Sequence, residues 1–254
     1  MHPNIDIFGT TISSFFLCMS IGIVVPIILA VILKPKDFHL SRLDILLASA
    51  LAAISGLFGA RLLFIALHWD PMKFKLSDLF NPLGGYAYFG ALLFSLTAIM
   101  IYVRMKKMKL LAMLDYAAPF LMLSQVFVRI GCFLGGCCYG RHTDIVFGVR
   151  FKVLDQLPRH PTQLYEMFLL IAIFIITRAI YKRGEKEKGS AHDGVVLFTA
   201  LTIYGFGRFF IEGLRTDSPE LIFGLTIAQT VCLVLFLLSI SGLFRAFANK
   251  NKRH

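Results

Sequence analysis

The segment that decides the fold runs from residue 12 to residue 33 and reads ISSFFLCMSIGIVVPIILAVIL. It holds no charged side chain. At about 1.5 Å per residue, a helix of this length crosses a hydrocarbon core about 30 Å thick. The residues before it, Met1 to Thr10, lack the basic region of a signal peptide. The segment therefore predicts a membrane-spanning helix that the chain retains.

Apolar runs of similar length recur along the chain. Together with the first they predict seven spans, at residues 12–33, 44–67, 84–103, 111–135, 162–181, 194–213 and 222–244. Composition agrees, because only 16% of the 254 residues are charged, whereas a soluble domain carries about a quarter. We predict an all-α fold, a polytopic membrane helical bundle of about seven transmembrane helices that forms a single membrane-embedded domain over residues 1–254.

Basic side chains gather in every second loop and in the C-terminal tail. They are Lys34, Lys36 and Arg42, then Arg104, Lys106, Lys107 and Lys109, then Lys182, Arg183, Lys186 and Lys188, and finally Arg245, Lys250, Lys252 and Arg253. Cytoplasmic loops carry such an excess of lysine and arginine, so we expect the N-terminus outside and the C-terminus in the cytoplasm. The net charge of +11 belongs to these loops and does not indicate nucleic-acid binding. The polar loop at about 136–161 is expected on the outer face.

The sixth predicted span carries a polar stripe. Tyr204, Arg208, Glu212 and Arg215 follow one another at i, i+4, i+8 and i+11, which places them on one face of a helix. A charged side chain inside a span costs roughly 2.5–3.5 kcal/mol, which makes these residues candidates for function. Two interpretations stay open: an ion pair in which Glu212 neutralises Arg208, and a site for an anionic headgroup with arginine as a bidentate donor.

Two further segments surround the polar loop. The first, residues 129–141, reads RIGCFLGGCCYGR, and its glycines favour either close helix packing or the approach of a lipid headgroup to the backbone. The second, residues 159–166, reads RHPTQLYE and places a proline at a helix start. A helix N-terminus beside Arg159 and His160 is typical of a phosphate site, or it is an ordinary interfacial helix start.

Three of the five cysteines form the pattern C-x4-C-C at Cys132, Cys137 and Cys138. Three interpretations compete. A zinc site could recruit His142 or His160, although the spacing matches no standard zinc pattern. A redox pair would normally use C-x-x-C, which is absent here. Packing at a helix end is the interpretation that we favour, so the sequence predicts neither a metal nor another cofactor.

In this order, the motifs resemble those of the bacterial phosphatidylglycerol:prolipoprotein diacylglyceryl transferases. Residues 159–166 match the family pattern R-H-P-[ST]-Q-L-Y-E at every position, and residues 204–215 match Y-G-x-x-R-x-x-x-E-x-x-R. Weaker similarities are the segment 59–62, the glycines 84, 85 and 90, the segments 115–119 and 129–141, and Gln229. The resemblance therefore extends along most of the chain.

The resemblance implies transfer of a diacylglyceryl group from phosphatidylglycerol to the lipobox cysteine thiol of prolipoproteins, with release of glycerol phosphate. The implied partners are phosphatidylglycerol, prolipoprotein signal peptides that carry a lipobox cysteine, and membrane lipids, without nucleic acid. The implied location is the bacterial plasma (inner) membrane, with the active site toward the outer leaflet.

The resemblance also implies which residues form the site. Arg129 and Arg208 would clamp the phosphate, Glu212 would orient Arg208, and His160 is the titratable imidazole nearby. These four are the catalytic candidates. The substrate-binding candidates are Arg61, Tyr88, Gly90, Cys132, Gly140, Arg141, Arg159, Gln163, Tyr165, Glu166, Tyr204, Arg215 and Gln229.

Alternatives remain because several positions differ from the family pattern. Phe15, Phe89 and Cys132 stand where the family places tyrosine, histidine or tyrosine, and asparagine. A relative that uses phosphatidylglycerol with a different acceptor is one alternative. A non-catalytic lipid-binding membrane protein is another. The third is a membrane thiol or metal protein built on the three clustered cysteines.

Overall fold

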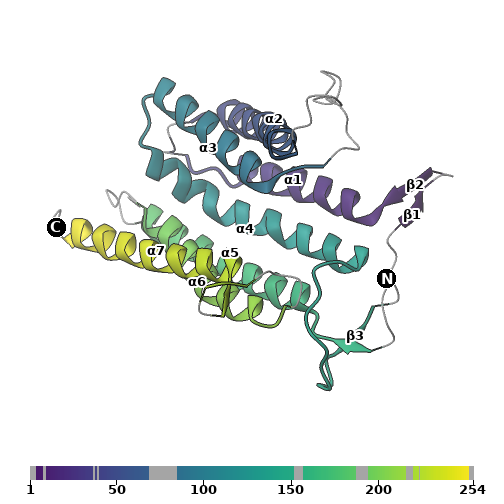
Figure 1. Cartoon of the computed structure of the whole chain (residues 1–254). Helices are drawn as coiled ribbons and strands as arrows, with labels where there is room; N and C mark the ends of the chain where they lie inside the picture. Colours follow the sequence, from purple (N-terminus) through teal and green to yellow (C-terminus); the bar gives the residue numbers. More distant parts are fainter. Residues whose placement is uncertain are drawn as a thin grey trace. The chain divides into compact units, whose positions relative to one another are not determined.

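The computed structural model of the chain describes residues 4–7, 10–36, 38, 40–68, 85–151, 157–186, 194–215, 220–222 and 224–251 (Figure 1). These residues form seven helices: α1 (Ser14–Ile32), α2 (Arg42–Leu67), α3 (Tyr88–Met105), α4 (Leu110–Gly135), α5 (Thr162–Lys186), α6 (Val195–Glu212) and α7 (Ile227–Asn251). Three short antiparallel hairpins join β1 (Asn4–Ile7) to β2 (Thr10–Ser13), β3 (Val149–Arg150) to β4 (Pro158–Arg159), and β5 (Glu220–Ile222) to β6 (Leu225–Thr226).

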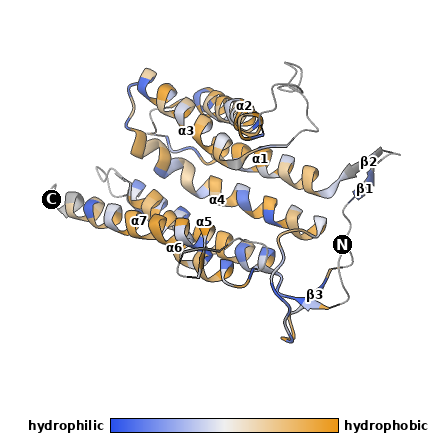
Figure 2. Cartoon of the chain, viewed as in Figure 1, coloured by the Kyte–Doolittle hydropathy of each residue, from blue (hydrophilic) through white to orange (hydrophobic). Residues whose placement is uncertain are grey.

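Six of these helices are long and apolar enough to cross a membrane, and the exception is α3, whose apolar stretch Phe89–Met105 is shorter. Figure 2 shows apolar residues along the helices of the chain. Many large apolar side chains on these helices are exposed, as expected where lipid rather than water surrounds them. The prediction of an all-α, multi-pass membrane protein is confirmed. The orientation of the termini stays a prediction.

The predicted start of the last span is wrong. The sequence predicts a helix from residue 222, but α7 begins at Ile227 because the preceding residues form the β5–β6 hairpin. A capping box ends the hairpin. The Gln229 backbone N–H donates to Thr226 Oγ1 over 3.1 Å, and the Thr226 backbone N–H donates to Gln229 Oε1 over 3.0 Å. These bonds satisfy donors that a helix start leaves open, which fixes the boundary.

The chain divides into two compact units. Unit 1 comprises Met1–Ala30 and Leu114–His254, and unit 2 comprises Val31–Met113. In unit 2, α2 and α3 pack closely through glycines: a Cβ atom added to Gly90 would lie 2.2 Å from the Gly59 carbonyl oxygen. A side chain at residue 90 would therefore push the two helices apart.

In unit 1, the core between α4, α5 and α6 is built from Ala118, Ile173 and Ala200, all fully or almost fully buried. Asp115 on α4 positions the start of α6, because its carboxylate accepts hydrogen bonds of 2.7 Å from the backbone N–H groups of Gly194 and Leu197. A carboxylate at a helix N-terminus satisfies open donors and complements the helix dipole. This contact ties α6, and the polar stripe that it carries, to α4.

Candidate functional site

The side chain of Glu166 connects three helices of unit 1. It comes from the second turn of α5 and is only 2% exposed. Arg129 of α4 places Nη2 at 2.8 Å from Glu166 Oε1, and Arg208 of α6 places Nη1 at 3.6 Å from Oε2. The Tyr204 hydroxyl of α6 donates to Oε1 over 3.0 Å. A buried carboxylate needs such partners, so Glu166 holds both arginines in place.

Tyr204, Arg208 and Glu212 of the polar stripe lie on α6 beside this carboxylate, whereas Arg215 lies three residues past the end of the helix and not on it as predicted. Glu212 is 1% exposed, and its Oε2 lies 2.5 Å from Arg208 Nη2 and 3.8 Å from Arg215 Nε. Arg208 therefore pairs with both Glu166 and Glu212, as expected for a guanidinium group that offers several donors in a fixed plane. The ion pair between Arg208 and Glu212 that helical spacing indicates is present.

The resulting cluster carries a net positive charge. Arg129, Arg208 and Arg215 face Glu166 and Glu212, so three guanidinium groups oppose two carboxylates and one positive charge remains. Among the residues that the structure describes, the buried Nε of Arg129 has no hydrogen-bond partner. A buried N–H group without an acceptor is costly, and an anion would satisfy it. The cluster is thus suited to a phosphate.

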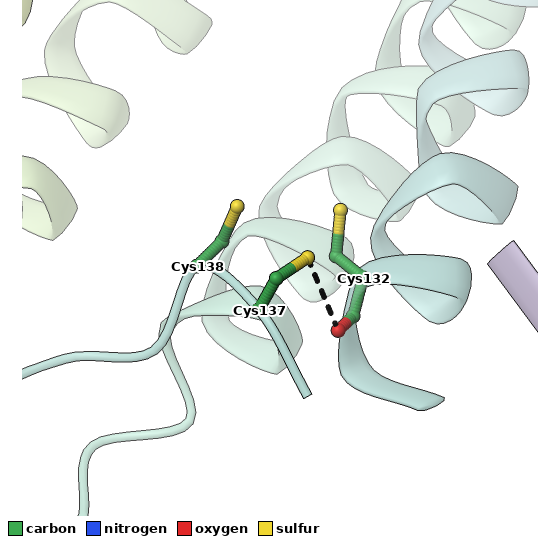
Figure 3. A group of neighbouring side chains, drawn as sticks. All are labelled: Cys132, Cys137 and Cys138. Carbon is green, nitrogen blue, oxygen red and sulfur yellow. Dashed lines mark hydrogen bonds between the residues drawn. The ribbon is translucent and has the colours of Figure 1, made fainter. Parts of the chain in front are cut away.

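The three clustered cysteines lie where α4 ends. The Gly136 N–H donates to the Phe133 carbonyl over 3.2 Å, and the Cys137 N–H donates to the Cys132 carbonyl over 3.1 Å. With Gly136 at φ +72°, these bonds make a Schellman motif that folds the chain back over the helix end. The Cys137 Sγ donates to the Cys132 carbonyl over 3.6 Å (Figure 3).

The cysteine loop is clamped by the first residues of α5. The Thr162 hydroxyl donates to the Cys138 carbonyl over 2.7 Å, and Gln163 Nε2 donates to the Cys137 carbonyl over 2.6 Å. Both side chains are almost fully buried. The T-Q pair of the 159–166 segment therefore secures the loop that carries two of the three cysteines.

Charge and neighbouring sulfur also act on one thiol of this loop. The Cys132 and Cys137 side chains beside it, and then the guanidinium groups of Arg215 and Arg129, hold the pKa of Cys138 below its usual range. Cys138 therefore lies within the field of the arginine cluster.

Main-chain hydrogen bonds join three segments around Gly140. The Gly140 N–H donates to the His160 carbonyl over 2.8 Å, and the Arg141 N–H donates to the Leu214 carbonyl over 2.8 Å. A Cβ atom at residue 140 would lie 2.7 Å from His160 Cβ and 2.7 Å from the Leu214 oxygen. Gly140 thus permits the cysteine loop, the start of α5 and the end of α6 to meet.

Arg159, one of the two loop arginines, contacts a histidine and a tyrosine. Arg159 places Nη2 3.0 Å from His142 Nε2, and its guanidinium carbon lies 5.1 Å from the ring centroid of Tyr139. Arg141 is exposed. Both belong to the rim of the site through the contact of their segments with Gly140 and Leu214.

His160 lies beside Tyr165, with Nδ1 3.2 Å from the tyrosine hydroxyl. Burial, and then the charge of Arg141, lowers the pKa of His160 below its ordinary value of about 6.5. A lowered pKa keeps the imidazole neutral at neutral pH, which suits a structural contact with Tyr165 better than a cationic role.

This shift predicts a dependence of stability on pH. The unfolded chain takes up the His160 proton near pH 6.5, whereas the folded chain takes it up only at lower pH, so His160 stabilises the fold above about pH 6.5. This contribution is lost as the pH falls through the folded pKa. Between about pH 7.5 and pH 5, the melting temperature should fall more for the natural chain than for His160→Gln. Equal falls in the two proteins would contradict this prediction.

Three predicted substrate-binding residues belong to unit 2. Arg61 on α2 is 6% exposed, and its Nη1 donates to the Gly85 carbonyl over 2.9 Å. Its guanidinium group also lies near the rings of Phe64 and Tyr86. Gly90 is the contact of α3 with α2. The side chain of Tyr88 lies outside the described part of the structure. The roles of these three in substrate binding stay predictions.

Gln229 has a clear structural task. Besides the capping box with Thr226, its Nε2 donates to the Phe209 carbonyl near the end of α6 over 3.4 Å. The side chain thus joins the start of α7 to α6, through the residue that follows Arg208.

The structure brings together most of the predicted site residues in unit 1. The ion-pair network and its hydroxyl partner contain Arg129, Glu166, Tyr204, Arg208, Glu212 and Arg215. Sequence reasoning missed that Glu166 is the shared partner of both clamp arginines, and that Thr162 holds the cysteine loop. The signal in the sequence was the position of Thr162 and Glu166 in the first two turns of an apolar helix. Polar groups that are buried there need hydrogen-bond or ion-pair partners.

Comparison with known proteins gives a consistent result. The family model described as prolipoprotein diacylglyceryl transferase matches residues 4–245. Three relatives are named phosphatidylglycerol–prolipoprotein diacylglyceryl transferase. The one from Clostridioides difficile is 32% identical over 230 residues, 90% of this chain and 88% of the relative. The one from Clostridium kluyveri is 33% identical over 243 residues, 92% and 91%. The one from Streptococcus equi subsp. zooepidemicus is 31% identical over 243 residues, 93% and 91%.

Proposed function

Because the chain belongs to the prolipoprotein diacylglyceryl transferase family, we propose that its buried arginine cluster is the phosphate site of this enzyme. The chain is a phosphatidylglycerol–prolipoprotein diacylglyceryl transferase, an enzyme of lipoprotein maturation. Its family assignment favours this function over the non-catalytic and thiol-protein alternatives. The observation that carries the phosphate site is the excess of one positive charge in the ion-pair cluster, together with the buried Arg129 Nε, which has no hydrogen-bond partner among the described residues.

The reaction requires a sulfur nucleophile and a phosphate leaving group. The acceptor sulfur, as a thiolate, attacks the carbon of the diacylglyceryl group that bears the phosphate. A C–S bond forms, the C–O bond breaks, and the electron pair leaves on the phosphate oxygen as glycerol phosphate. Negative charge therefore increases on the phosphate in the transition state, and fixed guanidinium groups stabilise it most where water is excluded.

Arg129 and Arg208 supply this stabilisation in our proposal. Glu166 and Glu212 hold Arg208 from two sides, and Glu166 also holds Arg129, so the guanidinium groups are positioned before the lipid arrives. Glu166 and Glu212 are engaged in ion pairs with these arginines, so we assign them to positioning rather than to proton transfer. Electrostatic stabilisation and proximity thus provide the main catalytic effect.

Both substrates are anchored in the membrane, which sets where they meet. We propose that the site opens toward the outer leaflet of the bacterial plasma membrane, where phosphatidylglycerol and the signal peptide of a prolipoprotein are both present. A lipobox cysteine is the acceptor in this proposal. The loop that joins α4 to α5, and that carries Gly140 and Arg141, would face the same side.

The test uses the purified chain in phosphatidylglycerol-containing bilayers with a lipobox peptide. We expect the peptide to gain the mass of one diacylglyceryl group on its cysteine, with release of an equal amount of glycerol phosphate. The matched control is the same peptide with serine in place of the cysteine, which should gain nothing. Glycerol phosphate release that is equal with both peptides, without any mass gain, would contradict the proposed acceptor.

A further inference from the structure

The thiols of Cys132, Cys137 and Cys138 converge at the end of α4. Their sulfur atoms all lie within 4.8 Å of one another (Figure 3). The other two cysteines, Cys18 and Cys232, are buried elsewhere and do not belong to this group. Convergence of three soft ligands is more than packing at a helix end requires, since small apolar residues would pack there equally well.

The backbone of this loop is arranged to present sulfur. The Schellman motif turns Cys137 back over Cys132, and Cys138 adopts φ +62°, a left-handed conformation that is unusual for a side chain with a Cβ atom. The clamps from Thr162 and Gln163 hold this conformation through the carbonyl groups of Cys138 and Cys137. Strain that the surroundings enforce in this way is characteristic of functional sites.

The number and spacing of the ligands point to one kind of metal centre. Zinc binds thiolate sulfur at about 2.3 Å in a tetrahedron, which places sulfur atoms about 3.8 Å apart, so small side-chain rotations would close the present triangle around an ion. A structural zinc site has four protein ligands, whereas a catalytic site has three and keeps one position open. Within the described part of the chain, the metal-ligating group here contains three side chains.

We propose that Cys132, Cys137 and Cys138 bind Zn²⁺ and that its fourth position takes the acceptor thiol. This inference rests on the proposed function and deepens it. Zinc-bound thiols lose their proton, so the ion would supply the thiolate that the transfer needs. The acceptor thiol replaces a zinc-bound water, its proton passes to water, and the sulfur keeps its electron pair for the attack on carbon. The zinc ion stays divalent throughout.

The surroundings of the cysteines fit this role. Three thiolates around Zn²⁺ carry one net negative charge, and the cationic Arg129 lies on α4 three residues before Cys132, which places both on one side of the helix. Arg129 also belongs to the phosphate cluster, so the same helix carries a residue of the phosphate site and a proposed zinc ligand. Cys137 is exposed, which leaves the metal position open to a peptide.

The first measurement is metal content without any substrate. The full chain, purified under reducing conditions and given Zn²⁺, should retain about one ion per chain. Cys132→Ser and Cys137→Ser should each lose most of it. Cys138→Gly tests the third ligand without a folding penalty, because glycine accepts the positive φ. Cys232→Ser is the matched control, since it removes a buried thiol outside the group and should keep the ion.

The second measurement asks whether the fourth position accepts a thiol. The chain is loaded with Co²⁺ in place of Zn²⁺, because the visible spectrum of cobalt reports tetrahedral thiolate ligation. Addition of the lipobox peptide should change the spectrum, and the serine peptide should not. Identical spectra with both peptides would overturn the proposed role in thiol binding.

Two further outcomes would overturn the proposal. One is a disulfide among the three cysteines with no retained metal. The other is full transfer activity in metal-free protein. In the second case the transfer itself would still be measured, so the proposed function would stand while the zinc inference fails. Loss of transfer in metal-free protein that Zn²⁺ restores would support the proposal, and zinc-loaded Cys232→Ser should transfer like the natural chain.

Discussion

Replacement of Arg129 by alanine is expected to lower the rate of diacylglyceryl transfer by about 10²–10³-fold, the usual effect of removing one fixed donor that stabilises transition-state charge. The buried Arg129 Nε has no hydrogen-bond partner in the described part of the chain, and neither has Arg208 Nη1, so both clamp residues have a donor available for the phosphate. The loss should appear in kcat, because the charge on phosphate is greatest in the transition state. The measurement is the initial rate of peptide modification over a range of phosphatidylglycerol content.

Arg178→Ala is the matched control for this experiment. Arg178 is a buried arginine of unit 1 whose Nη1 likewise has no hydrogen-bond partner among the described residues, but its guanidinium group lies over the rings of Phe120 and Tyr181 rather than in the cluster. It should retain a rate close to that of the natural chain. A similar rate for Arg129→Ala and the natural chain would overturn the clamp assignment. Equal losses in both variants would show that removal of any buried arginine disturbs the protein.

Replacement of Glu166 by alanine is expected to destabilise the protein by about 3–5 kcal/mol, the usual cost when one partner of a buried ion pair is removed. Glu166 contacts both Arg129 and Arg208. Without Glu166, the guanidinium groups of Arg129 and Arg208 lose a negative charge that offsets their own positive charge. The free energy of unfolding, measured in detergent against a denaturant, reports this directly.

Tyr204→Phe provides the control for Glu166→Ala. It removes one hydrogen bond to the same carboxylate and leaves both ion pairs, so a cost of about 1 kcal/mol is expected. Glu166→Gln should lie between the two, because the amide keeps the shape but not the charge. If Glu166→Ala unfolds with the same free energy as Tyr204→Phe, the ion pairs do not contribute as we infer.

The positions of most helices can be predicted from the sequence. Five of the seven predicted spans agree with a helix to within two residues at their start, among them 12–33 against Ser14–Ile32 and 111–135 against Leu110–Gly135. The start of α7 was the main error, because the capping box at Thr226 and Gln229 takes effect only where the hairpin before it forms. Side-chain hydrogen bonds at helix ends thus override an apolar run as the boundary signal.

The sequence by itself determined the membrane spans, the polar stripe on α6 and the family resemblance. The spans and the stripe each depend on the residues of one segment, through the apolar length needed to cross lipid and the helical period that brings Arg208 and Glu212 together, and the resemblance depends on the order of such segments. Only the tertiary structure decided that Glu166 lies between Arg129 and Arg208, and that three sulfur atoms meet beside the start of α5. Such contacts join segments far apart in the chain. They depend on how α4, α5 and α6 pack and on the close approach at Gly140, which no period within one segment encodes.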